Sequence, residues 1–210
     1  MEPAMPTTAA QVDPKRLAKI TRLDSGAHAK FAAGVCIMEA AAYVSRLPFS
    51  DHPECASPVI SAFMRSWNDA LPDSERTALL LPLLPKIINT RGSDALERRR
   101  SLMAADWLVR VNTPAWLRLA GLTVHADALA GLPEITSMEH VLSIRGPIEA
   151  ARLDAAATWV AAGAAARDAA WAAARAAAEA AAVQKLAATK TELQQSVIAI
   201  VERMCAATEG

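Results

Sequence analysis

The chain has 210 residues, and its 22 Lys plus Arg are balanced by 22 Asp plus Glu, so the formal net charge at pH 7 is zero. A neutral chain has no overall field to attract a phosphate backbone or an anionic membrane, so the composition disfavours nucleic-acid binding. The first 20 residues lack the apolar segment of a signal peptide, and no stretch of about 20 strongly apolar residues follows. We therefore predict a cytoplasmic protein that does not span a membrane.

Proline and glycine divide the chain into two parts. Eleven of the twelve prolines lie before position 134, and after Pro147 the only glycines are Gly163 and Gly210. Because both residue types end helices, the first part should hold short helices and the second one long helix. No strand-like alternation of apolar and polar residues occurs, so we predict an all-α fold. The expected parts are a loosely ordered N-terminal arm (1–33), a small multi-helix head domain (34–146) and an alanine-rich long helix with a C-terminal heptad segment (147–210).

Prolines bound the first two helices that we predict in the head. Apolar residues at helical spacing predict a helix over about 34–46, which Pro48 ends. Ser57 followed by Pro58 is the pattern of an N-cap and a first helical residue, and Pro72 closes the helix that they begin. The intervening segment should be a connecting loop.

The remaining helices of the head are predicted from further caps and breaks. Pro82 and Pro85 each remove a backbone donor, so the helix in SERTALLLPLLPKIIN should break or kink there. Ser93 begins a stronger helix, whose polar face should hold the arginine run 98–100 in solvent. Shorter helices are expected to begin near Thr113 and Pro114, near Thr123 and near Thr136.

The tail is dominated by alanine. Within residues 150–188, 23 of 39 residues are alanine, which has the highest helix propensity. A single helix from about 147 to 207 would be roughly 90 Å long, at about 1.5 Å per residue. Alternatively, Thr189 or Thr191 could cap a separate C-terminal helix that folds back on the alanine-rich segment. The sequence leaves the continuous, coiled-coil-like helix and the folded-back arrangement open.

Large apolar side chains in the tail indicate where another helix packs. After the alanine-rich segment they recur at alternating spacings of three and four, as do the a and d positions of about three heptads. Trp159 and Trp171 are isolated among alanines, which is typical of contact points. We therefore predict a protein partner or self-association through the C-terminal helix. The predicted interface residues are Trp159, Trp171, Val183, Leu186, Leu193, Val197, Ile200 and Met204.

Four residues of metal-binding type lie near one another in the head, namely Cys36, Glu39, His52 and Cys55. Thiolate, imidazole and carboxylate are the usual zinc ligands, so these four are candidate ligands of a zinc ion, the one cofactor we consider. Their spacing matches no standard zinc motif, and the alternative is that the cysteines are small buried apolar groups. Since the chain has only three cysteines, we expect reduced thiols rather than a disulfide framework.

Motifs of catalytic sites are missing from the sequence. It contains no GxSxG, GxxxxGK[ST] or GxGxxG motif, and its four histidines are scattered. These motifs place a nucleophilic serine or cradle a phosphate group, so neither chemistry has support. The sequence therefore predicts no catalytic residue and leans away from an enzyme.

A resemblance to a known group covers about residues 34–205. The segments VCIMEAAAYVSRLPFSDHPECASPVISAFMRSWNDALP and MAADWLVRVNTPAWLRLAGL, followed by the alanine-rich tract, resemble an uncharacterised family of actinobacterial and actinophage proteins with no assigned activity. The resemblance implies a helical head with an alanine-rich tail, and it transfers no site residue.

Three hypotheses about function follow. The first is a helical interaction or assembly protein, oligomerising or scaffold-like, that acts through its tail. The alternative is a zinc-dependent enzyme or a metal-stabilised binding module that uses Cys36, His52 and Cys55. A weaker alternative is ice or surface binding by the alanine-rich helix, which lacks the regularly spaced threonines that such a surface would use.

Overall fold

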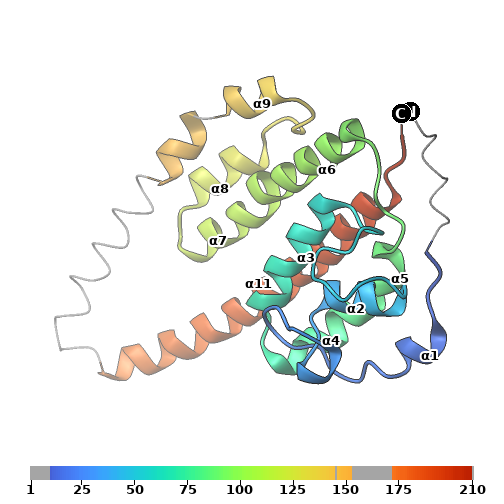
Figure 1. Ribbon diagram of the computed structural model, residues 1–210. Coiled ribbons are helices and arrows are strands. Elements are labelled where there is room, and N and C mark those ends of the chain that lie inside the picture. Colours follow the sequence, from blue (N-terminus) through green and yellow to red (C-terminus); the bar gives the residue numbers. More distant parts are fainter. Residues whose placement is uncertain (1–9, 145, 153–171, 210) are drawn as a thin grey trace. The chain divides into compact units, whose positions relative to one another are not determined.

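The computed structural model (Figure 1) describes residues 10–144, 146–152 and 172–209. All regular elements in these ranges are helices, with no strand among them, so the predicted all-α fold is confirmed. None of the described helices is long and apolar enough to cross a membrane. The helices are, in chain order, α1 (Pro14–Leu17), the 3-10 helix η1 (Phe31–Ala33), α2 (Ile37–Val44), α3 (Pro58–Ala70), α4 (Asp73–Leu80), the 3-10 helix η2 (Leu81–Leu83), α5 (Leu84–Ile87), α6 (Asp94–Trp107), the π-helical turn η3 (Leu108–Asn112), α7 (Thr113–Leu119), α8 (Thr123–Ala130), α9 (Met138–Ser143) and α11 (Ala172–Ala206).

The chain divides into two compact units. Unit 1 comprises Met1–Arg100 together with Val201–Gly210, and unit 2 comprises Ser101–Ile200. The division runs through α6 and α11, so contacts between distant segments define the units. The change in composition at Pro147, from which we expected the head and the tail, does not coincide with either boundary.

The centre of unit 1 is α2, which is buried on every side. Seven of its eight residues are buried, as expected for a helix without a polar face. Its N-terminus is closed by a capping box in which cysteine takes the place of serine. The Cys36 thiol accepts the N–H of Glu39 at 3.4 Å, and the Glu39 carboxylate accepts the N–H of Cys36 at 2.8 Å.

The next helix, α3, begins and ends as its caps dictate. Ser57 is the N-cap and accepts the N–H of Ile60 at 3.2 Å, with Pro58 as the first helical residue, so this prediction is confirmed. At the other end, Arg76 is only 3% exposed and donates to the carbonyls of Asn68 at 2.7 Å and Leu71 at 2.5 Å. A guanidinium therefore satisfies carbonyls that the end of α3 leaves without partners.

The prolines at 82 and 85 divide the following segment as predicted. Helix α4 ends at Leu80, the 3-10 turn η2 contains Pro82, and the short helix α5 begins at Leu84. The break follows from the missing N–H groups of Pro82 and Pro85.

Residues 10–33 are held more firmly than the loosely ordered arm predicted for 1–33. Ile20 and Leu23 are 4% and 0% exposed, and the N–H of Leu23 donates to the Thr77 hydroxyl at 2.9 Å. The N–H of Asp13 also donates to the Val44 carbonyl at 2.8 Å. Only residues 10–33 of the predicted arm lie within the described part of the chain.

Unit 2 is built on the end of α6, the turn η3, and helices α7 and α8. Its core holds Leu117, Ala126, Leu129 and Ala151. Pro114 has no N–H, and its ring would clash with the carbonyl four residues earlier in a regular helix. The π-helical turn before it widens the backbone, with the N–H of Thr113 bonded to the carbonyl five residues back.

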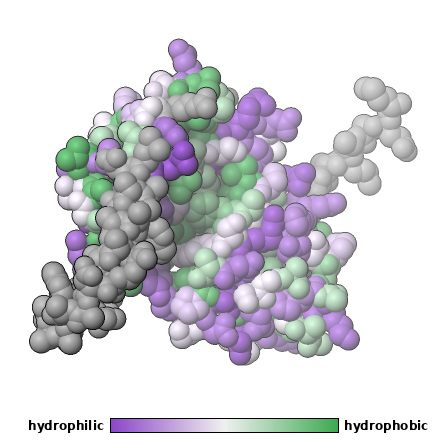
Figure 2. Space-filling view, turned by 90° about the vertical axis from the view of Figure 1, so that its left-hand side faces the viewer, coloured by the Kyte–Doolittle hydropathy of each residue, from purple (hydrophilic) through white to green (hydrophobic). Residues whose placement is uncertain are grey.

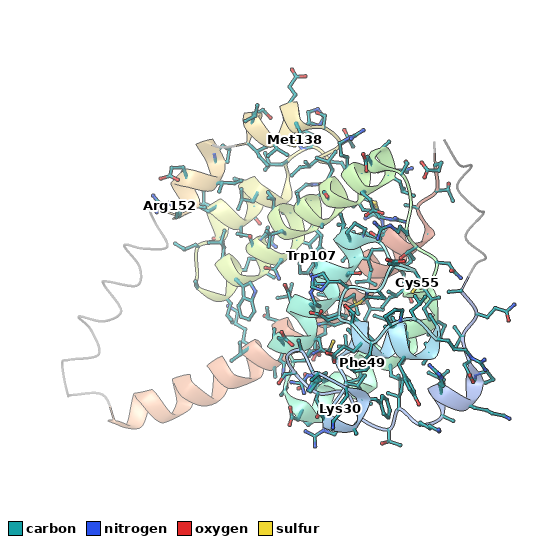
Figure 3. All side chains as sticks on the ribbon, in the orientation of Figure 1. Lys30, Phe49, Cys55, Trp107, Met138 and Arg152 are labelled. Carbon is teal, nitrogen blue, oxygen red and sulfur yellow. The ribbon has the colours of Figure 1, made fainter. Side chains whose placement is uncertain are left out.

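In α11 the helix passes through the two threonines without a break. Thr191 lies inside the helix, and its hydroxyl donates to the carbonyl of Ala187 at 3.0 Å, so a new helix does not begin there. Within unit 2, the Trp107 indole donates to the Ser196 hydroxyl at 2.9 Å (Trp107 is labelled in Figure 3). Lys185 donates to the Arg118 carbonyl at 3.4 Å. From the first contact to the second, the residue number rises from 107 to 118 in α6–α7 and falls from 196 to 185 in α11. This part of α11 therefore runs antiparallel to α6–α7.

Candidate functional site

Two of the four predicted zinc ligands come together, and they form the cap of α2. The Glu39 side chain is 1% exposed, and its carboxylate accepts the N–H groups of Cys36 and His28. The His28 Nδ1 lies 2.8 Å from the same carboxylate. Glu39 is therefore occupied by protein partners, and His28 is a contact that the sequence analysis did not anticipate.

The other two predicted ligands have different neighbours. The His52 side chain is 66% exposed, with Nδ1 at 2.7 Å from the Asp51 carboxylate. The Cys55 thiol donates to the Ser45 hydroxyl at 3.7 Å. Over the described residues, no group of three or more His, Cys, Asp or Glu side chains could hold a metal ion. Cys36, Cys55 and Cys205 are free thiols in this structure.

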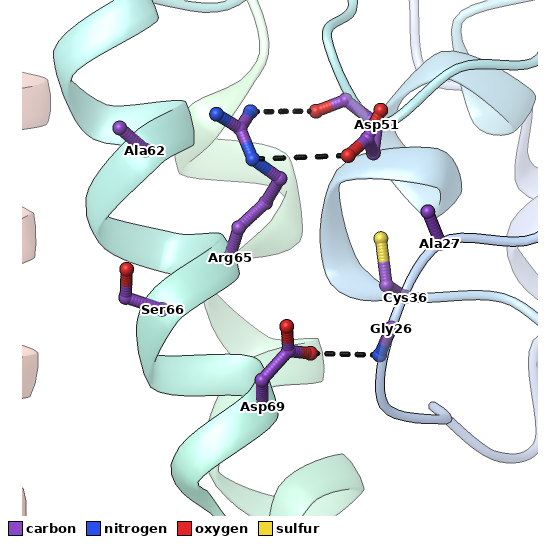
Figure 4. A pocket seen from close by; sticks show the side chains of 8 residues that line it. All are labelled: Gly26, Ala27, Cys36, Asp51, Ala62, Arg65, Ser66 and Asp69. Atoms are coloured by element: carbon purple, nitrogen blue, oxygen red, sulfur yellow. Dashed lines mark hydrogen bonds and ion pairs between the residues drawn. The ribbon is translucent and has the colours of Figure 1, made fainter.

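A cavity of about 380 Å³ in unit 1 lies beside this cap (Figure 4). At one end, Arg65 of α3 donates through Nη1 to the Asp51 carbonyl at 2.9 Å, and its Nε lies 3.8 Å from the Asp51 carboxylate. At the other end, the N–H of Gly26 donates to Asp69 of the same helix at 2.8 Å. The charged side chains that line the cavity thus fasten two loops to α3.

The chemistry of this cavity is limited by Cys36. Burial raises the pKa of the Cys36 thiol to about 12. A thiol attacks as its thiolate, which is scarce at neutral pH when the pKa is so high. The Cys36 thiol is therefore poorly suited to act as a nucleophile, and the contacts described for the cavity are structural.

A buried polar network in unit 1 surrounds Arg100, which the sequence analysis placed in solvent. That prediction is wrong, because Arg100 is 2% exposed. Its guanidinium is paired with Glu97 at 2.7 Å and donates to the Thr90 carbonyl at 2.5 Å. It also donates to the carbonyls of Met204 at 2.9 Å and Ala207 at 3.4 Å. Arg100 therefore closes the C-terminus of α11, where a positive charge also suits the helix dipole.

Other residues of unit 1 hold the same end of α11. Lys86 and Glu202 form an exposed ion pair at 2.6 Å. The backbone N–H and the hydroxyl of Ser93 donate to the Glu209 carboxylate at 2.9 and 2.5 Å, and these hydrogen bonds lower the pKa of Glu209. Met204 is fully buried. The last ten residues are thus an integral part of unit 1.

The predicted interface residues of the tail fall into two groups. Leu193, Val197, Ile200 and Met204 are between 0% and 7% exposed within the chain, whereas Leu186 is 44% exposed. Trp159, Trp171 and the side chain of Val183 lie outside the described part of the chain. A buried seam cannot pack against a second molecule unless it first separates from its own chain, so Leu186 is the described member of this set that is open to a partner.

Exposed apolar side chains are concentrated in unit 2. Figure 2 shows apolar residues, in green, reaching the surface of the face that it presents. Among the described residues, every large apolar side chain in the exposed class belongs to unit 2, and the described part of unit 1 has none. They are Leu108, Val111, Trp116, Val124, Met138, Leu142, Ile148 and Leu186.

Two of these side chains come from neighbouring helices. The contacts Trp107–Ser196 and Arg118–Lys185 set the antiparallel register of α6–α7 and α11. Trp116 of α7 and Leu186 of α11 each lie within two positions of the Arg118–Lys185 contact. Both are 44% exposed. A partner that covers both side chains would contact both α7 and α11. The sequence of either helix alone does not indicate such a shared surface.

Comparisons with protein-family models, with curated proteins and with solved structures gave no match for this chain.

Proposed function

We propose that the protein is a helical assembly protein that self-associates through the apolar surface of unit 2. The observation that carries the proposal is the asymmetry between the units, since the exposed large apolar side chains among the described residues all belong to unit 2. Exposed apolar side chains concentrated in one part of a protein favour an interaction surface there. The most exposed are Val124 at 78% and Leu142 at 70%.

Charge supports a second copy as the partner. The formal net charge of the chain is zero at pH 7, so two copies approach without overall repulsion. The surface is apolar, and an apolar surface fits another copy of itself when the two are related by a twofold axis.

The expected affinity is modest. Complete burial of a Val, Leu or Met side chain contributes about 1.5–3 kcal/mol, so a side chain that is half exposed in the monomer contributes about 1 kcal/mol. Several such contributions are comparable to the roughly 4–15 kcal/mol that association costs in lost freedom of motion. The protein should therefore interconvert between monomer and oligomer over an accessible range of concentration.

Analytical ultracentrifugation of the full chain over a wide concentration range tests the proposal. The double variant Val124→Gln with Leu142→Gln should weaken association by about tenfold or more, because two apolar side chains are lost from each copy. Thr123→Gln is the matched control, since Thr123 is an exposed neighbour of Val124 on α8. A wild-type protein that stays monomeric at every concentration would overturn the proposal, as would equal effects of the variant and the control.

A further inference from the structure

The end of α11 is held by residues far away in the sequence. Arg100 contacts the Met204 carbonyl across 104 positions, and the pairs Lys86–Glu202 and Ser93–Glu209 each span 116 positions. The acceptor site lies within residues 86–100, and it binds a helix end through a buried guanidinium, an ammonium and a hydroxyl. These groups recognise the end of α11 whichever chain it belongs to.

The preceding part of α11 is held in the same way in unit 2. Its contacts are Trp107–Ser196 and Arg118–Lys185, which span 89 and 67 positions. Both units therefore bind α11 through elements that precede it by a long stretch of chain. In each of these bonds the partner lies at least 67 positions before the residue that it holds.

An exchanged α11 would leave its own copy through the segment that precedes it. Residues 153–171 provide 19 residues between the described helical residues 146–152 and the start of α11. A chain of this length reaches up to roughly 60 Å when extended. Exchange of an identical element between copies keeps every native contact, which makes it a low-cost route to a dimer.

We propose that α11 is exchanged between two copies when the protein self-associates, so that Arg100, Lys86 and Ser93 of each copy bind the α11 end of the other. The inference rests on the proposed self-association and adds to the apolar surface of unit 2 a second contact between the copies. At low concentration the helix of the same chain occupies the site, because its effective concentration is high. At high concentration the helix of a second copy competes for it.

A charge exchange between two full-length variants tests the proposal. Lys86→Glu places two carboxylates opposite each other in a single chain, and Glu202→Lys places two ammonium groups opposite each other. In an exchanged mixed dimer, Glu at 86 of one copy meets Lys at 202 of the other, and the second site keeps its natural pair. Both partners are about half exposed, at 52% and 44%, so each variant should fold.

The readout is the composition of dimers. One variant is labelled with ¹⁵N, the two are unfolded and refolded together at high protein concentration and low salt, and native mass spectrometry counts the dimers. Exchange raises the equilibrium constant for mixed dimers roughly tenfold or more over the statistical value, because every like-charge contact is replaced by an attractive one. Arg152→Glu mixed with Glu149→Lys is the matched control. This exposed pair, at 2.6 Å, lies within residues 146–152, outside both α11 and its acceptor site, and it should give statistical mixing.

The outcomes separate this inference from the proposed function. Excess mixed dimers in the first mixture, with statistical mixing in the control, support exchange of α11. Dimers that mix statistically in both cases overturn the exchange and leave self-association intact. If the mixture and the wild-type protein are both monomeric, the exchange of α11 and the proposed self-association are both overturned.

Discussion

Replacement of Arg100 by Met should destabilise unit 1 far more than any neighbouring substitution. The guanidinium is 2% exposed and makes hydrogen bonds to three carbonyl groups and one carboxylate. Methionine fills a similar volume but donates no hydrogen bond, so Glu97, 13% exposed, keeps the Ser57 hydroxyl as a donor but loses the Arg100 charge. Removal of one member of such a buried pair costs about 3–5 kcal/mol. We expect a loss of that size in the free energy of unfolding of unit 1.

The assay is urea denaturation combined with hydrogen exchange. Unfolding gives the change in stability, and amide exchange in 201–209 reports directly on the end of α11. Arg99→Met is the matched control, since Arg99 is the adjacent exposed arginine, and an exposed substitution should change stability by about 0.5 kcal/mol or less. Equal stabilities of the two variants, or unchanged exchange in 201–209 of Arg100→Met, would refute the role given to Arg100.

Two further predictions concern the region around α2. The pKa of the Cys36 thiol, about 12 in the folded chain, lies above its ordinary value of 9.0, so its contribution to stability is complete below pH 9 and is lost as the pH rises towards 12. At pH 10 the loss is about 1.4 kcal/mol, measured by denaturation at several pH values; Cys36→Ser keeps a capping oxygen and should lack this loss. Gly34→Ala should destabilise the fold, because Gly34 has φ of 134° and an added Cβ would lie 2.4 Å from Cδ2 of His28. Gly146→Ala, which meets no atom within 4 Å, is its control, and equal melting temperatures would contradict the reasoning.

The elements that could be predicted from the sequence are those whose cause is local. Ser57 and Pro58 begin α3, and the prolines at 82 and 85 break the next segment, because a cap or a missing donor acts within one helical turn. The capping box of α2 is also local, but cysteine is not a usual capping residue, and its thiol was interpreted as a zinc ligand or a buried apolar group. A Glu three residues after Cys36 was the signal that could have identified the cap.

The candidate site could not be predicted in the same way, because its partners are distant in the sequence. Which of three consecutive arginines enters the interior depends on what lies opposite each of them. Arg100 is buried because α11 returns to unit 1 and presents its carbonyl groups there, whereas its neighbours Arg98 and Arg99 are exposed. Likewise, the exposed apolar side chains of unit 2 include Trp116 of α7 and Leu186 of α11, and these two helices are joined by the contact of Lys185 with the Arg118 carbonyl, which spans 67 positions.

The two buried arginines of unit 1 show why the end of α11 matters for assembly. Arg76 closes α3 from within the same local segment, so its partners stay in place whenever that segment is folded. Arg100 performs the same task for a helix that ends more than 100 residues later. Its partners are present only when α11 has docked, and without them a buried charge loses its hydrogen bonds. Unit 1 therefore needs the end of an α11 helix whenever it is folded. A second copy can supply that end, and the buried charge of Arg100 then keeps its hydrogen-bond partners.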